Sequence, residues 1–267
     1  MLTREASSLR IFGFLKKLLI TEHFLSKRGE SPIFASMKTL ILLFFLGCFG
    51  ITFKSTAQLK PIYSQADYAF WLHLPADSIL KAKPPVLIFL HGKSLSGTDL
   101  TRVKRYGVIS EIEKGRKIPA VVVAPQTNNG WDPIKVMSVL SFVKKNFDVD
   151  TNRVYVVGMS MGGYGTLNFA GKYPEHVAAA VALCGGGNIK DGCNLATVPL
   201  WIQHGTMDKA VPISESEKIV RAIKNCNGGE NLKYTALKGA DHGDLERMFR
   251  TDELYTWLFQ FTKQPQE

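Results

Sequence analysis

The feature that most constrains the fold of this chain is a series of short runs that are almost wholly apolar. Turn residues bound such runs at 85–90, 120–124, 154–157, 178–183 and 198–203. A strand with one solvated face alternates in polarity, so a run that is apolar throughout indicates a strand buried on both faces, as in a parallel sheet. The alternating segment 68–74 and the more polar segment 233–237 predict two further strands, the second near an edge.

Segments with helical periodicity separate these runs. One apolar helix face is predicted by residues at i, i+3, i+4, i+7 and i+11, namely Val136, Val139, Leu140, Val143 and Phe147. Further helices are expected over 161–172, from a capping box of Ser214 and Glu217 to Gly228 and Gly229, and over 250–261. This alternation predicts an α/β fold with a mostly parallel sheet and helices on both faces, in a single domain over 58–267.

Residues 1–57 are predicted to lie outside this domain. After a basic residue, 39–53 carries no charge, and Ser55 and Ala57 place small residues at positions −3 and −1 of a cleavage site before Gln58. A basic start, a short apolar stretch and a small-x-small exit are typical of a secretory signal peptide. The sequence therefore predicts cleavage after Ala57 and a secreted or periplasmic protein without stable membrane insertion.

The position of this signal within the chain leaves alternatives open. Signal peptides begin close to the initiator, so Met37, which heads the signal, is the expected translation start, and 1–36 is an N-terminal extension. The amphipathic stretch 9–20 could otherwise lie on a membrane surface. A retained membrane anchor and a lipoprotein anchored through Cys48 are the remaining alternatives.

The charge distribution gives little support to a nucleic-acid partner. The formal net charge of +10 falls by half when 1–57 is removed, since that segment is strongly basic. The remaining basic residues are scattered and form no stripe interleaved with aromatic side chains, as nucleic-acid binding would need. Ligand spacing of the zinc kind and glycine-rich phosphate loops are also missing from the sequence, so neither a metal nor another cofactor is expected.

A serine lies between two glycines at a predicted strand–helix junction. Gly158, Ser160 and Gly162 follow the strand expected at 154–157 and open the helix expected at 161–172. Glycines let neighbouring backbone segments approach closely, so a tight turn can present the serine hydroxyl above the sheet. The helix N-terminus directs free N–H groups toward developing negative charge. This arrangement predicts Ser160 as a nucleophile.

A serine nucleophile needs a base and a group that orients the base. Of six histidines, only His242 lies late in the chain, in a loop after the last strand, where it could reach Ser160. Asp208 follows the strand at 198–203 and precedes His242, the chain order expected of nucleophile, acid and base. Its carboxylate could accept the imidazole N–H and stabilise the imidazolium. Asp241 competes for this role, but a residue adjacent to His242 cannot easily reach the correct side of its ring.

The oxyanion formed during attack needs two N–H donors. Met161 directly follows the nucleophile, and Lys93 follows the strand at 85–90. The backbone amides of these two residues are therefore the expected oxyanion hole.

Four segments carry these residues, in the order HGKSLSG (91–97), GMSMGGYG (158–165), HGTMDKAVP (204–212) and GADHG (239–243). Together they resemble the α/β-hydrolase superfamily, and within it secreted bacterial carboxylesterases of the dienelactone hydrolase, phospholipase/carboxylesterase and feruloyl-esterase-like type. Some relatives of that type are labelled predicted peptidases. The resemblance covers about 66–262 and implies an α/β-hydrolase fold and a serine esterase that works through an acyl-enzyme intermediate.

Alternatives to this function are a secreted serine peptidase of the same fold and a non-catalytic binding module. The interval 184–197, where relatives commonly insert a lid, is too short for a cap domain, so an open site for a small or polysaccharide-linked ester is expected. Asn129, Trp131 and Tyr164 are expected to contact the substrate. Trp131 could stack on a sugar or an aromatic acyl group, or could serve packing alone.

Three cysteines follow the predicted signal peptide. Cys184 is expected at the carboxyl end of its strand, whereas Cys193 precedes the next strand and Cys226 ends a helix that returns to the opposite edge of the sheet. An oxidising compartment permits one bridge. The sequence therefore predicts a Cys193–Cys226 disulfide and a free Cys184.

Overall fold

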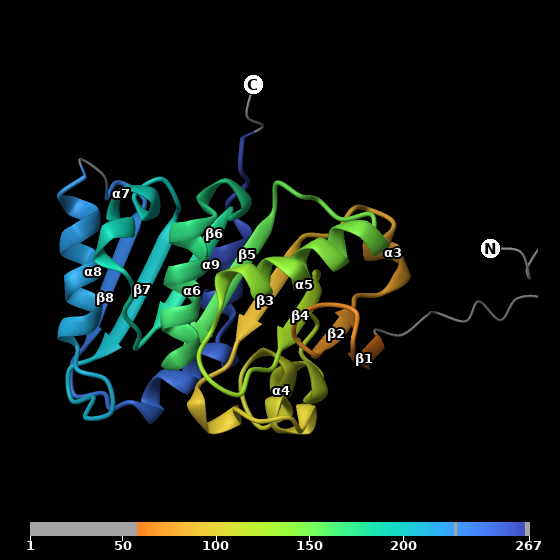
Figure 1. Ribbon diagram of the computed structural model, residues 1–267, viewed down its shortest axis with the longest axis horizontal. Coiled ribbons are helices and arrows are strands. Elements are labelled where there is room, and N and C mark those ends of the chain that lie inside the picture. The colour runs from red at the N-terminus through yellow and green to blue at the C-terminus, as the bar shows by residue number, and fades with distance from the viewer. Residues whose placement is uncertain (1–57, 227–228, 265–267) are drawn as a thin grey trace, which may run out of the picture. The chain divides into compact units, whose positions relative to one another are not determined.

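Eight strands form one sheet in the computed structural model, which describes residues 58–226 and 229–264 (Figure 1). The strands are β1 (Gln58–Ile62), β2 (Phe70–Leu74), β3 (Val86–Leu90), β4 (Val121–Pro125), β5 (Val154–Met159), β6 (Ala179–Leu183), β7 (Leu200–Gly205) and β8 (Leu232–Leu237). Their order across the sheet is β1-β2-β4-β3-β5-β6-β7-β8. The pairs β1–β2 and β2–β4 are antiparallel and all the others are parallel, so the prediction of a mostly parallel sheet is confirmed.

All seven strands expected from the sequence are present, and β1 is the strand that the sequence did not indicate. Its residues, Gln58–Ile62, are exposed or half-buried and include Pro61, so no apolar run marks it. Proline lacks a backbone donor and is tolerated at a sheet edge, where β1 pairs only with β2. The predicted signal peptide and N-terminal extension lie outside the described residues.

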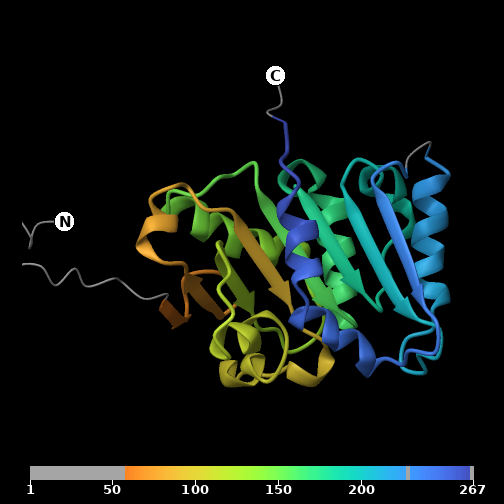
Figure 2. The ribbon, with the colours of Figure 1, turned by 180° about the vertical axis from the view of Figure 1, so that it is seen from behind.

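Helices cover both faces of the sheet, as Figures 1 and 2 show from opposite sides. The helices on the face toward the viewer in Figure 1 are α5 (Pro133–Asn146), α6 (Met161–Lys172), α7 (Gly192–Leu195) and α8 (Ser214–Lys224). The opposite face carries α4 (Val108–Glu113) and α9 (Asp252–Phe259). One-turn helix α3 (Asp77–Leu80) precedes β3, and 3-10 helices occupy Lys93–Leu95, Leu100–Lys104, Pro174–His176, Ile189–Asp191 and Gly243–Arg250.

The central strand β3 is apolar throughout because it contributes to two cores. Along β3, Val86, Ile88 and Leu90 pack with α5 and α6, whereas Leu87 and Phe89 pack with α4 and α9. All five residues are fully buried. Side chains alternate between the faces of a strand, so a strand covered on both faces has no polar position.

The boundaries of two helices differ from the sequence prediction. Helix α8 begins at Ser214 with Ile213 in the N-cap position, so the expected capping box is wrong. The helix ends at Lys224, four residues before Gly228. At the C-terminus, the expected helix over 250–261 starts only at Asp252, after the 3-10 helix Gly243–Arg250.

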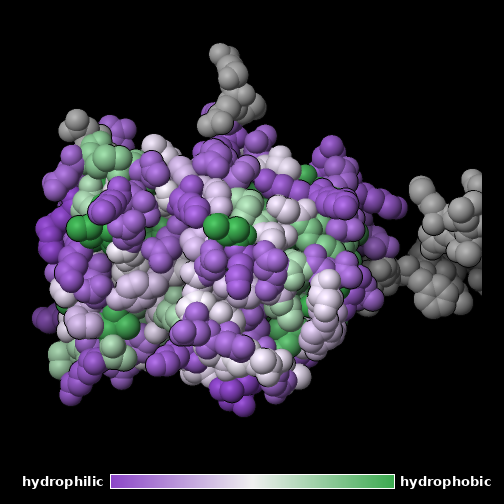
Figure 3. Space-filling view, in the orientation of Figure 1, coloured by the Kyte–Doolittle hydropathy of each residue, from purple (hydrophilic) through white to green (hydrophobic). Residues whose placement is uncertain are grey.

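The predicted disulfide is confirmed. Cys193 and Cys226 are bonded with a Cα–Cα distance of 5.1 Å, and Cys184 is free and buried. The face shown in Figure 3 is mainly hydrophilic, with hydrophobic side chains in small separate spots. Among the residues that the structure describes, no helix is both long and apolar enough to cross a bilayer.

Candidate active site

The strand order places the candidate site at a reversal of the sheet. β4 lies on one side of β3, but the chain then crosses back and β5 pairs with the other side. Ligand sites in open α/β sheets form at the carboxyl ends of strands where the winding direction reverses. The loop after β3, with Lys93, and the turn after β5, with Ser160, meet at this point.

Ser160 occupies a strained turn between β5 and α6. Its φ of 61° and ψ of −122° lie where few non-glycine residues are found. The turn is held by Ser160 N–H, which donates to Leu183 O at 2.8 Å, and by Tyr164 N–H, which donates to Ser160 O at 3.0 Å. Strain of this kind costs about 1–3 kcal/mol and persists only where surrounding contacts enforce it.

The two glycines that flank Ser160 allow α6 to start directly against the sheet. A Cβ at Gly162 would lie 1.8 Å from Leu90 O, and one at Gly158 would lie 2.3 Å from Gly162 O. No side chain fits at such distances from backbone atoms. Glycine is therefore required at both positions for the turn to form.

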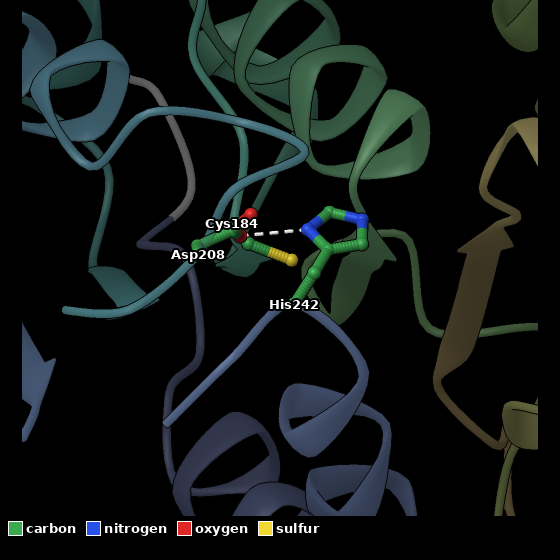
Figure 4. A group of neighbouring side chains, drawn as sticks. All are labelled: Cys184, Asp208 and His242. Atoms are coloured by element: carbon green, nitrogen blue, oxygen red, sulfur yellow. Dashed lines mark hydrogen bonds and ion pairs between the residues drawn. The ribbon is translucent and has the colours of Figure 1, made fainter. Parts of the chain in front are cut away.

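His242 and Asp208 form a short hydrogen bond. The Nδ1–H of His242 donates to Asp208 Oδ2 at 2.6 Å, and Figure 4 shows the other ring nitrogen on the side away from Asp208. The Asp208 carboxylate is shielded from solvent, and its Oδ1 accepts from the amides of Ala210 and Val211, each at 2.9 Å. Burial opposes ionisation, but the hydrogen bonds from Val211, His242 and Ala210 together lower the pKa of Asp208.

The competing carboxylate, Asp241, makes different contacts. Its Oδ1 accepts from Asp244 N–H at 3.0 Å, and its own amide donates to Asp244 Oδ2 at 2.9 Å. These bonds hold Asp241 at the start of the 3-10 helix Gly243–Arg250. Asp208 is thus the carboxylate that the fold brings to His242.

Ser160 and His242 line one open pocket of about 740 Å³. Three other residues expected at the site, Lys93, Met161 and Tyr164, line the same pocket. No hydrogen bond between the Ser160 hydroxyl and His242 is recorded in the described part of the chain. Catalytic hydrogen bonds are often long in the absence of substrate and tighten in the complex.

The two expected oxyanion donors both lie at helix starts. Met161 is the first residue of α6, and Lys93 is the first residue of a 3-10 helix. Amides at such positions have no acceptor within their own helix, so they are available to a ligand. The neighbouring amide of Gly92 donates to the Tyr106 hydroxyl at 3.2 Å, which fixes the loop that carries Lys93.

Two of the three expected substrate contacts lie elsewhere. Asn129 and Trp131 line a separate pocket of about 630 Å³ and do not border the one that holds Ser160. Trp131 Nε1–H donates to His91 O at 3.1 Å, and its ring packs edge-on against His91 and Tyr68, with centroid distances of 4.8 and 5.4 Å. The expectation that these residues border the Ser160 pocket is therefore wrong, and packing is the role that the contacts of Trp131 indicate.

Two pocket residues were missed by the sequence analysis. Tyr106 and Glu246 line the Ser160 pocket but come from segments that carry no motif. Tyr106 precedes α4, and Glu246 lies on the 3-10 helix that follows His242. Only the packing of these segments against the carboxyl edge brings them to the site, so no local pattern could have identified them.

Cys184, Asp208 and His242 form a group whose possible ligand atoms lie within 4.8 Å of one another (Figure 4). Burial raises the pKa of the Cys184 thiol to about 12. A metal ion would have to displace the proton of this buried thiol. Asp208 and His242 are also engaged with each other. The group therefore suits a hydrogen-bonded acid–base pair above a buried thiol better than a metal site.

The histidine that precedes the oxyanion loop is buried in its neutral form. His91 is fully buried; its Nδ1–H donates to Gly92 O at 2.8 Å, and its Nε2 accepts from Thr127 N–H at 3.2 Å. One proton thus satisfies both nitrogens. Burial lowers the pKa of His91 to about 4, from an ordinary value near 6.5.

His91 should make the stability of the protein depend on pH. Between about pH 6.5 and 4 the unfolded chain binds a proton at this site, and the folded chain does not. The contribution of neutral His91 to the free energy of unfolding is therefore complete above pH 6.5 and decreases as the pH falls toward 4. The loss is about 3 kcal/mol by linkage. Urea unfolding of the parent and of His91→Gln at pH 7 and pH 4 measures it: the parent should lose about 3 kcal/mol more than the variant. Equal losses would contradict a buried neutral His91.

Comparison with known proteins identifies an esterase family. The model of the family described as "Putative esterase" matches residues 63–256, which is more than half of the chain. A bifunctional acetylxylan esterase/xylanase, XynS20E of Neocallimastix patriciarum, is 28% identical over 196 residues. That match covers 70% of this chain but 28% of the relative, so the chain spans little more than a quarter of that protein.

Solved structures share the fold. The crystal structure of a thermostable esterase is 25% identical, with a TM-score of 0.63, over 78% of this chain and 64% of that one. The S954A mutant of the feruloyl esterase module from Clostridium thermocellum, complexed with sinapinate, is 15% identical, with a TM-score of 0.59, over 79% of this chain and 91% of that one. Both likenesses support the α/β architecture predicted from the sequence.

Proposed function

This chain belongs to the family described as "Putative esterase", and we propose that it is a carboxylic ester hydrolase that works through Ser160, His242 and Asp208. The observation that carries the proposal is the 2.6 Å hydrogen bond between His242 and a shielded Asp208 carboxylate beside the pocket that Ser160 lines. A base oriented in this way can accept the proton of a serine hydroxyl.

The proposed reaction has two stages. In the first, His242 Nε2 takes the Ser160 proton as Oγ attacks the ester carbonyl, and the amides of Lys93 and Met161 stabilise the oxyanion. His242 then returns the proton to the departing alcohol oxygen, which leaves an acyl group on Ser160. In the second stage, His242 deprotonates a water molecule that attacks the acyl carbon, and it then gives this proton to Ser160 Oγ as the bond between Oγ and the acyl carbon breaks and the acid is released. Asp208 stays ionised throughout and stabilises the imidazolium.

The substrate class that we propose is a small or polysaccharide-linked ester. Between β6 and β7 the chain forms only the 3-10 helix Ile189–Asp191 and the one-turn helix α7, so no cap closes over the pocket there. An open site admits an ester attached to a polymer. The resemblance to an acetylxylan esterase supports the same class.

Peptides are a less suitable substrate. Amide cleavage needs the leaving nitrogen to be protonated as it departs and the peptide to be held in register. The described residues form one sheet with its flanking helices, and they include no second domain that could hold an extended peptide. We therefore propose ester rather than peptide hydrolysis.

A substrate panel tests this assignment. Under one set of conditions, p-nitrophenyl acetate, a feruloyl ester, acetylated xylan and a peptidyl nitroanilide are compared, with Ser160→Ala as the background for each. The esters should be hydrolysed well above that background, and the nitroanilide should not be. A peptide substrate with the highest kcat/KM would overturn the esterase assignment and leave the fold intact.

We also propose that the protein is exported and that its mature form begins at Gln58. The Cys193–Cys226 disulfide supports this, because such bonds persist in oxidising compartments. Lipidation at Cys48 is the alternative. Mass spectrometry of the exported protein distinguishes a Gln58 terminus from a lipidated Cys48.

A further inference from the structure

A second, fully buried histidine contacts the carboxylate of the proposed triad. His204, on β7, has no exposed surface, and its Nε2 lies 3.4 Å from Asp208 Oδ2. This is the same oxygen that accepts from His242 Nδ1 at 2.6 Å. Asp208 Oδ2 therefore lies between two imidazole rings, of which only His242 reaches the pocket.

The partners of His204 determine which of its nitrogens carry protons. Nε2 faces two acceptors, Val211 O at 2.9 Å and the Asp208 carboxylate, so this nitrogen must bear a proton. Nδ1 lies 2.7 Å from Ser216 Oγ, and the same hydroxyl lies 2.6 Å from Gly185 O. A carbonyl oxygen can only accept, so the single hydroxyl proton of Ser216 is directed to Gly185. The proton between Ser216 and His204 must then come from Nδ1.

Neither neutral form of His204 satisfies all of these contacts. With the proton on Nδ1 alone, the lone pair of Nε2 faces two acceptors. With the proton on Nε2 alone, the hydroxyl proton of Ser216 can reach either Nδ1, at 2.7 Å, or Gly185 O, at 2.6 Å, but not both. The other of these two acceptors then faces a lone pair of Ser216 Oγ. Buried polar groups left unpaired in this way are costly. His91 provides the contrast, since one proton satisfies both of its nitrogens.

We propose that His204 is a buried imidazolium that shares Asp208 with His242 and tunes His242 as a base. His204 is then a positioning residue for the proposed ester hydrolysis, on which this role rests. The His204 cation and the Asp208 anion neutralise each other inside the fold, which allows both to be buried. The positive charge of His204 also opposes protonation of His242, because the two rings contact one oxygen and lie within about 6 Å of each other. A charged His204 thus favours the neutral form of His242, which is the form that acts as a base.

Other ionisable groups lie in the pocket and on the elements next to the two histidines. They are Cys184 after β6, Tyr164 on α6, Glu215 on α8, Lys209 beside Asp208, and Lys93, Tyr106 and Glu246 in the pocket. Burial raises the pKa of Cys184 and of Tyr164 to about 12 and that of Tyr106 above its ordinary value, so these three stay protonated at neutral pH. The hydrogen bond from Lys218 lowers the pKa of Glu215, which stays ionised.

Nuclear magnetic resonance of the full chain tests the protonation state directly. With ¹⁵N-labelled histidine at pH 8, the ring of His204 should show two protonated nitrogens, and that of His91 should show one. The signals are assigned by their loss in His204→Gln and His91→Gln. An unprotonated ring nitrogen in His204 would overturn the proposal. This readout does not require activity, so it is independent of whether the chain hydrolyses esters.

The pH profile of kcat/KM for p-nitrophenyl acetate tests the consequence. The acid limb of this profile is the fall in kcat/KM at low pH, where the base becomes protonated. In His204→Gln, which keeps an N–H donor but no charge, the acid limb should move to higher pH by roughly one to two pH units. Ser216→Ala removes the acceptor for Nδ1–H and should move the limb in the same direction, which keeps the test open if His204→Gln does not fold. His176→Gln is the matched control, because His176 lies on the 3-10 helix after α6, outside the pocket, and should leave the limb in place. An unchanged limb in both folded variants would overturn the tuning role.

Discussion

Replacing Ser160 with alanine should lower kcat/KM for p-nitrophenyl acetate by roughly 10⁵-fold or more. The side chain supplies the attacking oxygen, and the turn at φ 61° holds that oxygen at the start of α6, beside the amide of Met161. Without the Ser160 hydroxyl, His242 has no serine proton to accept. The nucleophile and base of a triad act as a unit, so His242→Ala should cost a similar factor. The measurement is initial-rate kinetics on purified protein, with unfolding curves to show that each variant is folded.

The acid of the triad offers a matched pair of variants. Asp208→Asn removes the charge that stabilises the His242 imidazolium and should lower kcat by roughly 10⁴-fold. Asp241→Asn is the control, because the Asp241 carboxylate contacts Asp244 and not the His242 ring, and it should leave kcat nearly unchanged.

A fluorophosphonate probe should label the parent protein at Ser160. A folded Ser160→Ala variant with turnover near that of the parent would remove the proposed mechanism, and a parent that the probe does not label would favour a binding module.

Gly162→Ala should lower the free energy of unfolding by about 3 kcal/mol or more, as expected for severe steric overlap. Helix propensity alone predicts the opposite sign, since alanine is favoured over glycine inside a helix by about 1 kcal/mol. The added Cβ, however, would lie 1.8 Å from Leu90 O and 2.9 Å from His91 O. These are backbone atoms of a central strand and of the oxyanion loop, which cannot rotate away. Activity should therefore fall together with stability.

Gly243→Ala is the control for this variant. Gly243 has no positive φ, and a Cβ there would meet only Asp241 Oδ1, at an ordinary contact distance of 3.5 Å. Urea unfolding of the two variants and the parent should show a loss only for Gly162→Ala. A Gly162→Ala protein as stable as the parent would mean that α6 can move away from β3, and the close approach inferred at this turn would then be incorrect.

Much of the architecture was predictable because short sequence patterns encode the strands and helices. The strands β3, β4, β5 and β6 are apolar at nearly every position, a requirement of burial on both faces that a sequence displays directly, and β7 departs from this only at Gln203 and His204 near its carboxyl end. Helix α6 was predicted with its observed bounds, Met161–Lys172. Where the pattern is weak the prediction failed: β1 is exposed, and the Ser214–Glu217 spacing that suggests a capping box lies inside α8. A short motif specifies a local conformation only when the chain on either side agrees with it.

The sequence by itself determined the alternation of buried strands and helices and the candidate triad residues Ser160, Asp208 and His242. Each of these follows from short segments whose periodicity or turn chemistry is encoded within a few residues. Only the tertiary structure decided which distant side chains meet: Asp208 contacts His242, Tyr106 and Glu246 line the pocket, and Trp131 does not. The physical reason is that these contacts join segments far apart in the chain. They depend on strand order and on how each loop packs over the carboxyl edge of the sheet, and neither property is encoded in a local pattern.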